Sequence, residues 1–539
     1  MDNEDLKKLS KKELIDIVES LPSGTLLWNK QKENIIDEYV DKIPVLKNVE
    51  EFNILSSTNK NTNLLIESDN FEGLGALINL YKNKIDFIYI DPPYNTGKDF
   101  IYKDKLVSAD DPFKHSKWLS FMEPRIMLAY ELLSKDGVFI CSINDVEIEY
   151  LKLILNKIFK KQNTEILIWH KPVKMKQTNT FKGEHEYLLV AYKSKTGRKL
   201  NRPKRTRELK KTILQNPDND PRGDWFTGEL TKTESKWNKD SKKFYSVKKP
   251  DGKDLEAEFL VTKQEFQELK DNREVWWTKN GSGLPRKKMW PNIAKEKTPS
   301  SVLNDEGFTQ TDGNKDLENI FNKSHEEVFQ NPKPVELIKW LIEVCTKKDS
   351  IVLDFFAGSG TTAQAVLELN RDQDSNRKSI LITNNENNIV TDVTYKRISK
   401  VIKGFTGFKS KESHKQCDEN LLYYRIKPVT AEKNDFSLKE LAKAQIDTIF
   451  LLEGTHIEII KNEDYQINKD IEDAYTIILY DIEKLKEAVS KIPESELKLN
   501  IYFFTLDTIK NFKNETKFLH NHFTVNVNIF PIIMKVPNF

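Results

Sequence analysis

The chain has 539 residues, of which 31% are charged, and a formal net charge of only +2. At about 150 residues per domain this length predicts three or four domains, and any affinity for nucleic acid must come from local basic patches. The three cysteines (Cys141, Cys345 and Cys417) lie far apart without metal-ligand spacing, so we expect a reducing cytoplasm and no zinc site. The absence of a ~20-residue apolar run and of a signal-peptide core predicts a soluble protein with no membrane partner.

The first part of the chain, residues 1–60, is rich in lysine and places apolar residues at helical spacing. We interpret it as a small helical N-terminal region that packs on its own protein. Residues 63–69 read as a strand ending in an acid, and residues 71–81 have helical spacing. Asp69 is therefore well placed to cap that helix together with Asn70.

The run Ile85–Ile90 is short, β-branched and aromatic, which is typical of a buried strand in a parallel sheet. Pro92 and Pro93 cannot continue a strand, because proline lacks an N–H group and has a fixed φ. Asp91 and Tyr94 are therefore expected on a stiff loop at the carboxyl end of that strand. Ligands bind at this end of the strands in open α/β sheets.

These residue types suit methylation of an amine. Asp91 and the Pro92 carbonyl can accept hydrogen bonds from the two N–H groups of a flipped adenine, which favours a lone pair directed toward a methyl donor. Tyr94 can stack on the base and replace the stacking lost from the duplex. Such a reaction needs no nucleophilic side chain. The alternative is an ordinary strand followed by a proline-rich turn.

Strand and helix patterns alternate beyond this loop. The expected helices are 116–133 and 147–159, and the expected strands are 137–143, 165–170 and 187–192. This alternation predicts an α/β fold, a doubly wound and mostly parallel sheet with a right-handed crossover at each step. His170 and His185 are isolated histidines, which we interpret as structural.

The composition changes at Ser194, where residues 195–211 hold nine basic residues and one acid. The next hundred residues scatter aromatic residues among polar and basic ones, among them Trp225, Phe226, Trp237, Trp276, Trp277 and Trp290. Basic side chains neutralise phosphates, and Arg, Asn and Gln read base edges, so we predict a DNA-binding target-recognition insert at 194–330. The alternative is a solvated linker. The candidate DNA contacts are Arg198, Lys199, Arg202, Lys204, Arg205 and Arg207.

A second small-residue turn follows the insert. Residues 335–345 are expected to form a helix, with Pro334 in its first turn. Residues 351–353 then read as a buried strand, and 361–369 as a helix. Gly358 and Gly360 between them would let the backbone approach a ligand. No lysine follows Gly360, so a phosphate-binding P-loop is not supported.

The side chains around this turn suit S-adenosylmethionine, because Asp354 can meet its charged amino-acid part and Phe355 and Phe356 its flat adenosine. A strand at 379–383 and a helix at 395–403 are expected to complete the unit. Strands are also expected at 477–480, 500–506 and 523–529, with a helix at 482–489.

The segment from Asp354 to Thr362 resembles motif I of the S-adenosylmethionine-dependent amino-methyltransferases, and Asp91-Pro-Pro-Tyr94 resembles their motif IV. Motif IV comes first, which is the order of the β group. Residues 60–405 are similar to the modification (Mod) subunit of type III restriction-modification systems. The further segments that carry this similarity are 91–97, 115–122, 185–190, 331–337 and 383–388.

The resemblance implies a site-specific DNA adenine-N6 methyltransferase that acts on double-stranded DNA and forms a homodimer. It implies a catalytic half at 61–193, a cofactor half at 331–405, and a small C-terminal α/β domain at 406–539 for subunit or partner contacts. Asp69 would contact the cofactor's adenine and Glu386 its ribose. The implied catalytic residues are Asp91, Pro92, Pro93 and Tyr94; the implied cofactor residues are Asp69, Asp354, Phe355, Phe356, Gly358, Gly360, Thr361 and Glu386.

Three alternatives stay open. Methylation of cytosine N4 is chemically similar, although related enzymes that methylate cytosine more often carry Ser at the position of Asp91. A solitary epigenetic methyltransferase and an inactive DNA-specificity subunit are the others. The sequence shows no Walker A or helicase motif, so ATP-dependent cleavage would need a separate restriction (Res) subunit. The resemblance places the protein in the cytoplasm of a prokaryote, encoded by the cell or by a phage.

Overall fold

The computed structural model describes most of the chain. The described residues are 42–56, 61–97, 101–102, 105–172, 181–196, 199–202, 204–205, 214–290, 295–296, 298–305, 307–407, 413–430, 445–470, 473–480, 482–493, 498–503 and 524–529. They divide into two compact units, one of Met1–Leu200 with Ser300–Phe539 and one of Asn201–Pro299. Among the described helices, none is both long enough and apolar enough to cross a membrane.

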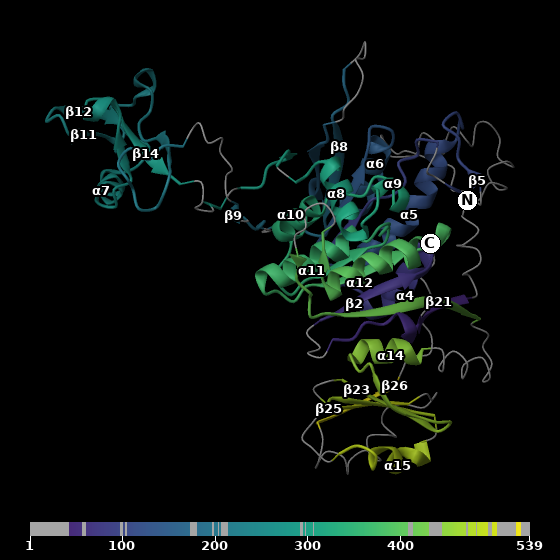
Figure 1. The fold of residues 1–539 in the computed structure, drawn as a ribbon. Helices are drawn as coiled ribbons and strands as arrows, with labels where there is room; N and C mark the ends of the chain where they lie inside the picture. Colours follow the sequence, from purple (N-terminus) through teal and green to yellow (C-terminus); the bar gives the residue numbers. More distant parts are fainter. Residues whose placement is uncertain are drawn as a thin grey trace. The chain divides into compact units, whose positions relative to one another are not determined.

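A ten-stranded sheet forms the centre of the first unit, in the order β1-β21-β2-β18-β17-β3-β6-β8-β7-β16 (Figure 1). Every neighbouring pair from β21 to β6 is parallel. The predicted α/β, mostly parallel sheet is therefore confirmed. The strands are β1 (Lys42–Asn48), β2 (Thr62–Glu67), β3 (Ile85–Ile90), β6 (Leu133–Ile143), β7 (Thr164–His170), β8 (His185–Tyr192), β16 (Val302–Leu303), β17 (Ile351–Asp354), β18 (Lys378–Thr383) and β21 (Asn420–Thr430).

Helices cover both faces of this sheet, because successive residues of a strand point to opposite sides. Ile88 and Ile90 of β3 pack in one core with α4 (Asn70–Tyr81), α5 (Lys114–Leu132) and α6 (Ile148–Phe159). Phe87 and Tyr89 pack in another core, on the opposite face, with α10 (Val335–Cys345) and α11 (Thr361–Gln373). Residues of β18 and β21 pack on α12 (Tyr395–Lys403).

The strands that carry the two predicted motifs are neighbours, although more than 250 residues separate them. In the register of β17 and β3, Val352 pairs with Phe87 and Leu353 with Ile88. The pairing is parallel, so both strands end at the same edge of the sheet. This edge holds the loop that begins at Asp91 and the turn that begins at Phe355.

We expected a right-handed crossover between each strand and the next, and this expectation is wrong between β7 and β8. These two strands are antiparallel to each other, and β8 is antiparallel to β6. The chain therefore reverses direction between β7 and β8, and β7 again runs in the direction of β3 and β6. His170 at the end of β7 and His185 at the start of β8 consequently lie at the same edge as Asp91.

The prediction of a helical N-terminal region is wrong for residues 42–48. These residues form β1, which pairs antiparallel with β21, and the side chains of Ile43 and Val45 are buried against Val429. The backbone hydrogen bonds of an edge strand replace those of a helix here. Residues 1–41 lie outside the described part of the chain.

The first unit also contains parts of two regions that we assigned elsewhere. β21 lies in the range predicted for the C-terminal domain but sits between β1 and β2 in the large sheet. Likewise β16 pairs with β7, and α8 (Gln310–Phe321) packs on α10 and α12. The predicted insert at 194–330 thus continues past the second unit, which ends at Pro299.

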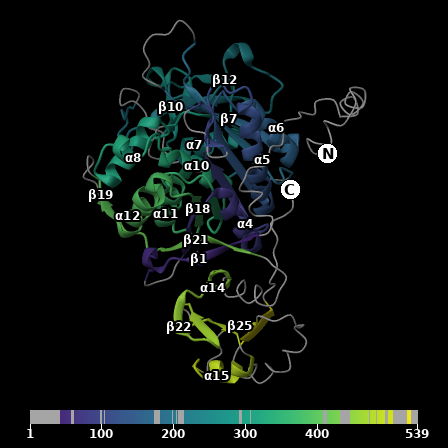
Figure 2. The ribbon, with the colours of Figure 1, turned by 90° about the vertical axis from the view of Figure 1, so that its right-hand side faces the viewer.

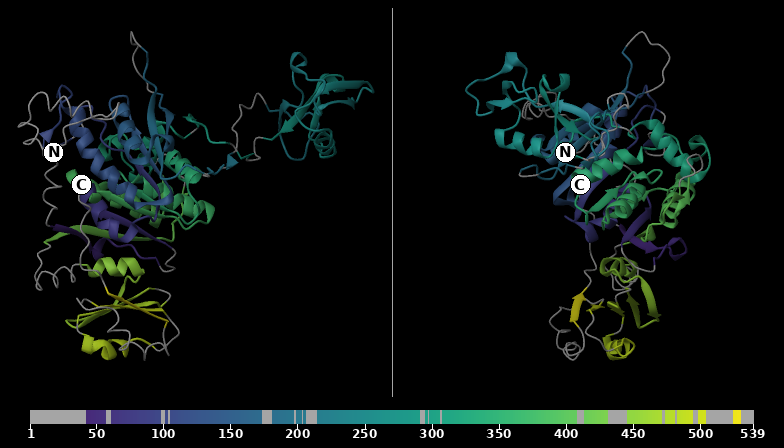
Figure 3. Two further views of the ribbon diagram at one scale, coloured as in Figure 1. Left: turned by 180° about the vertical axis from the view of Figure 1, so that it is seen from behind. Right: turned by 60° about the vertical axis from the view of Figure 1, so that its left-hand side comes forward.

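The C-terminal part of the first unit forms a five-stranded sheet in the order β22-β23-β24-β25-β26 (Figures 2 and 3). Ile477 faces a core with α15 (Leu485–Val489), and the next residue, Ile478, faces one with α14 (Ile446–Glu453). The three strands expected here correspond to the last three, and β22 and β23 were not predicted. Their bounds are β22 (Ile457–Lys461), β23 (Tyr465–Lys469), β24 (Tyr475–Leu479), β25 (Lys498–Phe503) and β26 (Thr524–Ile529).

The second unit has a hydrophobic core of its own, built around Leu230, Ala257, Phe259 and Phe266. Trp225 is also fully buried. Residues 214–290 are thus a folded domain, which excludes a solvated linker for that range. Its elements are β10 (Phe226–Glu229), β11 (Phe244–Lys248), β12 (Asp254–Glu258), α7 (Lys263–Asp271), β13 (Val275–Trp277) and β14 (Pro285–Met289).

Candidate active site

Acidic residues meet at the carboxyl edge of the parallel strands. Asp91 follows β3, Asp354 is the last residue of β17, and Asp69 follows β2. β18 lies between β2 and β17, so the loop with Glu386 begins at the same edge. The edge thus brings together the predicted catalytic and cofactor loops from both halves of the sequence.

Asp91 belongs to a network of charged groups that we call the Asp91 cluster: Asp91, Tyr94, Lys171, Glu186 and Lys333. The Lys333 ammonium donates to Asp91 Oδ2 at 2.6 Å and to Tyr94 Oη at 3.2 Å. Tyr94 Oη lies 3.0 Å from Asp91 Oδ1 and 3.1 Å from Glu186 Oε2. Lys171 donates to Glu186 Oε1 at 2.6 Å. Two ammonium groups and two carboxylates therefore surround one phenol.

The pKa shifts in this cluster favour a neutral phenol and an ionised Glu186. Loss of contact with water, together with the charges of Asp91 and Glu186, raises the pKa of Tyr94 well above its usual value. Burial alone would raise the pKa of Glu186, but the ammonium groups of Lys333 and Lys171 outweigh burial and lower it. Tyr94 thus keeps its proton and can donate it to either carboxylate.

The loop that carries Asp91 and Tyr94 is fixed from two sides. Trp118 in α5 is fully buried, and its indole N–H donates to the Pro93 carbonyl at 2.8 Å. Asn95, which has a positive φ of 56°, donates to the buried Glu147 at 2.6 Å. His115 Nδ1 lies 2.7 Å from the same Glu147 oxygen. Burial raises the pKa of Glu147.

The turn after β17 is held by its own side chains. Asp354 Oδ1 accepts the Phe356 N–H at 3.0 Å, and Oδ2 accepts the Thr362 hydroxyl at 2.6 Å. Burial raises the pKa of Asp354 to about 7. Gly358 and Gly360 have φ of 47° and 82°, a region that residues with a Cβ rarely adopt.

Helix α12 closes this turn from behind. The hydroxyl of Thr394, the residue before α12, donates to the Gly358 carbonyl at 2.6 Å. Within α12, the buried Arg397 donates to the hydroxyls of Ser359 at 2.8 Å and Thr361 at 2.9 Å. The backbone of the glycine turn is thereby fixed at the edge next to Asp91.

A family model described as DNA methylase matches residues 85–419, which include both motifs and both halves of the sheet. The chain belongs to the N6/N4 DNA methylase family. The predicted cofactor, S-adenosylmethionine, is the methyl donor of this family.

Among its relatives, the chain is 32% identical over 357 residues to the Mod subunit of the type III restriction-modification enzyme StyLTI of Salmonella typhimurium. It is 31% identical over 427 residues to the EcoPI Mod subunit of Escherichia phage P1. These alignments cover 62% and 65% of this chain but only 54% and 63% of those proteins. The type II methyltransferase M.KpnI of Klebsiella pneumoniae is 29% identical over 400 residues, which cover 68% of this chain and 94% of that protein.

Asp69 is the N-cap of α4. Its carboxylate accepts the Phe71 N–H at 2.7 Å, and the buried Arg125 lies 3.3 Å away. The Arg125 guanidinium also lies 3.8 Å from the centre of the Phe121 ring. The centre of that ring is 6.0 Å from the centre of the Phe356 ring. The capping role is therefore present, and the same residues border an aromatic surface beside the glycine turn.

The contacts described above do not include the other predicted residues. Glu386 is exposed in a short 3-10 turn, Glu386–Asn388, beyond β18. Lys199 and Arg202 are exposed, whereas Lys204–Arg205 forms β9, which pairs with β15 (Lys295–Glu296). Arg198 and Arg207 lie outside the described residues.

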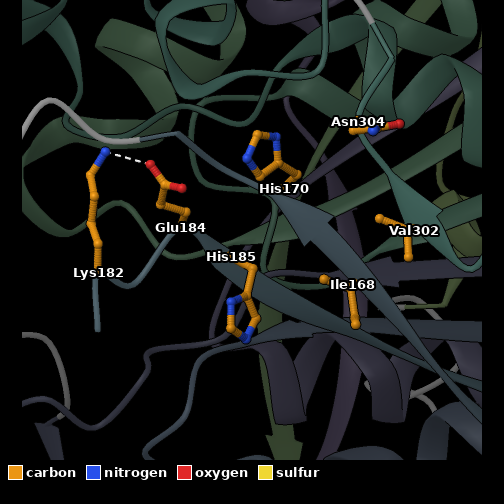
Figure 4. Close-up of a pocket in the computed structure, with 7 residues that line it drawn as sticks. All are labelled: Ile168, His170, Lys182, Glu184, His185, Val302 and Asn304. Carbon is orange, nitrogen blue, oxygen red and sulfur yellow. Dashed lines mark hydrogen bonds and ion pairs between the residues drawn. The ribbon is translucent and has the colours of Figure 1, made fainter. Parts of the chain in front are cut away.

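The two isolated histidines, His170 and His185, line a pocket at this edge of the sheet (Figure 4). Both are exposed, so they are not core histidines. His185 Nε2 lies 2.9 Å from the Tyr187 hydroxyl, and Ile168 and Val302 line the same pocket. Figure 4 also shows the ion pair of Lys182 with Glu184 at its rim.

Sequence reasoning did not identify Lys171, Glu186, Lys333 or Arg397 as site residues. Glu186 and Lys333 lie inside segments that carry the resemblance, at 185–190 and 331–337, and a lysine between two prolines was a usable signal. Nothing local marked Lys171 or Arg397. Their roles depend on the pairing of β7 with β8 and on the packing of α12 behind the glycine turn.

Proposed function

We propose that the protein is a site-specific DNA methyltransferase that transfers a methyl group from S-adenosylmethionine to N6 of a flipped adenine. The observation that carries this proposal is the adjacency of β3 and β17, whose ends bring Asp91 and the Gly358–Gly360 turn to one edge. Methyl transfer requires that the amine and the methyl donor lie side by side, and their proposed sites are at this edge. Family membership supports the same reaction.

In this proposal Asp91 and the Pro92 carbonyl accept the two N–H groups of the amine, and Tyr94 stacks on the extruded base. The rigid loop contributes by positioning rather than by covalent chemistry. Pro93 stiffens the loop, and Trp118 and Asn95 anchor it.

S-adenosylmethionine would supply an activated methyl group on a sulfonium. Its proposed site is the edge bordered by Asp69, Phe356 and the glycine turn, with Glu386 near its ribose. The predicted contact of Phe355 is not part of this site, because its side chain is fully buried in the core. The residues fit this group, because the rings of Phe121 and Phe356 form an aromatic surface beside the turn, and Gly358 and Gly360 give its backbone a conformation with positive φ. Asp354 and Thr361 hold the turn itself.

Adenine is favoured over cytosine by Asp91 at the first position of motif IV. The deciding experiment is incubation of the purified protein with DNA and S-adenosylmethionine, followed by mass spectrometry of the nucleosides. N6-methyladenine is expected. N4-methylcytosine would replace the adenine assignment, and neither product together with no cofactor binding by calorimetry would favour an inactive specificity subunit.

The similarity to Mod subunits supports a role as the modification and specificity subunit of a type III system. We propose that the second unit, Asn201–Pro299, supplies DNA contacts, that the protein dimerises in the cytoplasm, and that a separate Res subunit binds it. Purification of the chain with the product of the neighbouring gene, with masses measured by light scattering, tests both assemblies. A solitary methyltransferase would show no such partner.

A further inference from the structure

Lys333 places a cation on the groups that the proposed function assigns to the target amine. The residue is only 8% exposed and lies between Pro332 and Pro334, which restrict its backbone. Its ammonium contacts both Asp91 and Tyr94. It also lies 5.3 Å from the centre of the Tyr94 ring and 5.6 Å from that of Trp169. A carboxylate, a hydroxyl oxygen and two aromatic rings together make a site for a positive nitrogen.

The target amine and the Lys333 ammonium compete for this site. Both are N–H donors to the same carboxylate, and an ammonium 2.6 Å from Asp91 Oδ2 neutralises the charge that would polarise the amine. The amine nitrogen itself becomes positive as it accepts the methyl group, so two like charges would meet at short range. Groups that hold an ammonium now are well suited to stabilise that developing charge once the lysine has moved.

A second carboxylate lies within reach of Lys333. Glu186 Oε2 is 3.1 Å from the Tyr94 hydroxyl, which itself contacts the ammonium. Attraction to Lys333 and Lys171 outweighs burial and lowers the pKa of Glu186, so this acceptor is ionised. The Tyr94 hydroxyl has one proton and can turn it from Glu186 to Asp91 as the lysine moves in the other direction.

We propose that Lys333 holds the place of the target amine on Asp91 and passes to Glu186 when the base enters the site. This proposal rests on the proposed function. The exchange leaves both Asp91 and Glu186 with an N–H donor throughout, and a buried carboxylate without a donor would be costly. Lys333 is therefore a positioning residue. It holds the oxygens of Asp91 and Tyr94 in the arrangement that binds a nitrogen, and it leaves when the target amine arrives.

The test is a ratio of two affinities measured on the same protein. The methylated position is first located by sequencing DNA from cells that express the gene. Two duplexes are then compared with S-adenosylhomocysteine present, one with the target adenine and one with purine, which lacks the exocyclic amine. In the wild type, the affinity gained from the hydrogen bond of the amine to Asp91 is offset by the loss of the Lys333–Asp91 contact. The ratio of affinities is therefore expected to lie near one.

Lys333→Met removes the competitor, so the amine gains a full hydrogen bond to a charged group and the adenine-to-purine ratio rises by about tenfold or more. Lys333→Arg keeps a cation and the wild-type ratio. Glu186→Gln removes the receiving carboxylate and lowers the ratio. Lys339→Met is the matched control, because Lys339 lies on α10 but pairs with Glu336 and Glu368, and it leaves the ratio unchanged.

An unchanged ratio in Lys333→Met would overturn the proposal, and a lowered ratio would show that the lysine helps to hold the amine. Because each ratio compares two ligands of one protein, a loss of stability in the variant cancels. The proposed function is tested separately, by transfer of labelled methyl groups to DNA. If the wild type labels no DNA, that function fails, and the competition is then measured with millimolar adenosine and purine riboside by saturation-transfer NMR.

Discussion

Two aspartates end neighbouring strands of one sheet, and they are held in opposite ways. Asp354 is buried, and both of its oxygens bind donors within its own turn, Phe356 and Thr362. The Asp91 side chain is 29% exposed, and one of its partners, Lys333, is 242 positions away in the chain. The first carboxylate is part of the scaffold, whereas the second keeps an exposed side that a ligand can reach. An acid at the end of a strand is thus not by itself a site.

The largest expected effect comes from Asp91→Ala. If Asp91 polarises the amine, methyl transfer falls by about 10²–10³-fold or more, the usual cost of losing one preorganised electrostatic group. Binding of S-adenosylmethionine changes little, because the glycine turn is held by other residues. Single-turnover transfer of labelled methyl groups and calorimetry of the cofactor measure the two quantities. A variant that retains near-wild-type turnover would remove Asp91 from the mechanism.

The second prediction concerns Asp354 and pH. Its pKa is raised from 3.8 in the unfolded chain to about 7 in the folded protein, so the folded state binds the extra proton between these values. The contribution of Asp354 to the free energy of unfolding is therefore greatest below pH 4. This contribution is lost as the pH rises toward 7. The loss is at most about 4 kcal/mol, since one pKa unit corresponds to about 1.4 kcal/mol.

Asp354→Asn should flatten this part of the pH profile, because an amide fills the same space without ionising. Urea unfolding at several pH values between 4 and 8 measures the change. Asp316 also has a pKa raised by burial, to about 6, so Asp316→Asn serves as a comparison with a smaller expected effect. Parallel profiles for the wild type and Asp354→Asn would mean that Asp354 does not titrate in this range.

The third prediction concerns the support of the Asp91 loop. Trp118→Phe keeps an aromatic ring in the core, although a smaller one, and removes the N–H that reaches the Pro93 carbonyl. An unsatisfied carbonyl costs about 1–3 kcal/mol when it is fully buried, and less in a partly buried loop such as this one. Part of that cost appears as a looser loop. We expect kcat to fall by about tenfold while the KM for S-adenosylmethionine stays within twofold. An increase in that KM with kcat unchanged would place the tryptophan on the cofactor side instead.

Local sequence predicted the elements that carry the site. Strand Ile85–Ile90 and helices Val335–Cys345 and Tyr395–Lys403 have the predicted bounds, because an uninterrupted apolar run or a helical period is bounded there by proline or glycine. The glycine turn and the proline loop were likewise visible, since each requires particular residues. These features depend on neighbours in the chain.

The partners across the sheet were not visible in the sequence. β1 was missed because a strand at the edge of a sheet has no local signature beyond a weak period of two. The place of β21 inside the large sheet follows from its pairing with β1 and β2. The pairing of β7 with β8 brings Lys171 to Glu186, and Glu186 contacts Tyr94. Such pairing is a long-range property. Lys333 was recognised only as part of a motif, and its contact with Asp91 follows from the order of strands in the folded sheet.

The smallest predicted effect concerns the support of the other turn. The buried Thr394 donates its hydroxyl proton to the Gly358 carbonyl, and Thr394→Val removes that donor with little change in shape. The expected cost is about 1 kcal/mol, equivalent to roughly a fivefold increase in the KM for S-adenosylmethionine, with kcat nearly unchanged. Steady-state kinetics with the cofactor varied measures it. Because Trp118→Phe is expected to change kcat and Thr394→Val the cofactor KM, a variant that changed both alike would mean that the two turns act as one rigid unit.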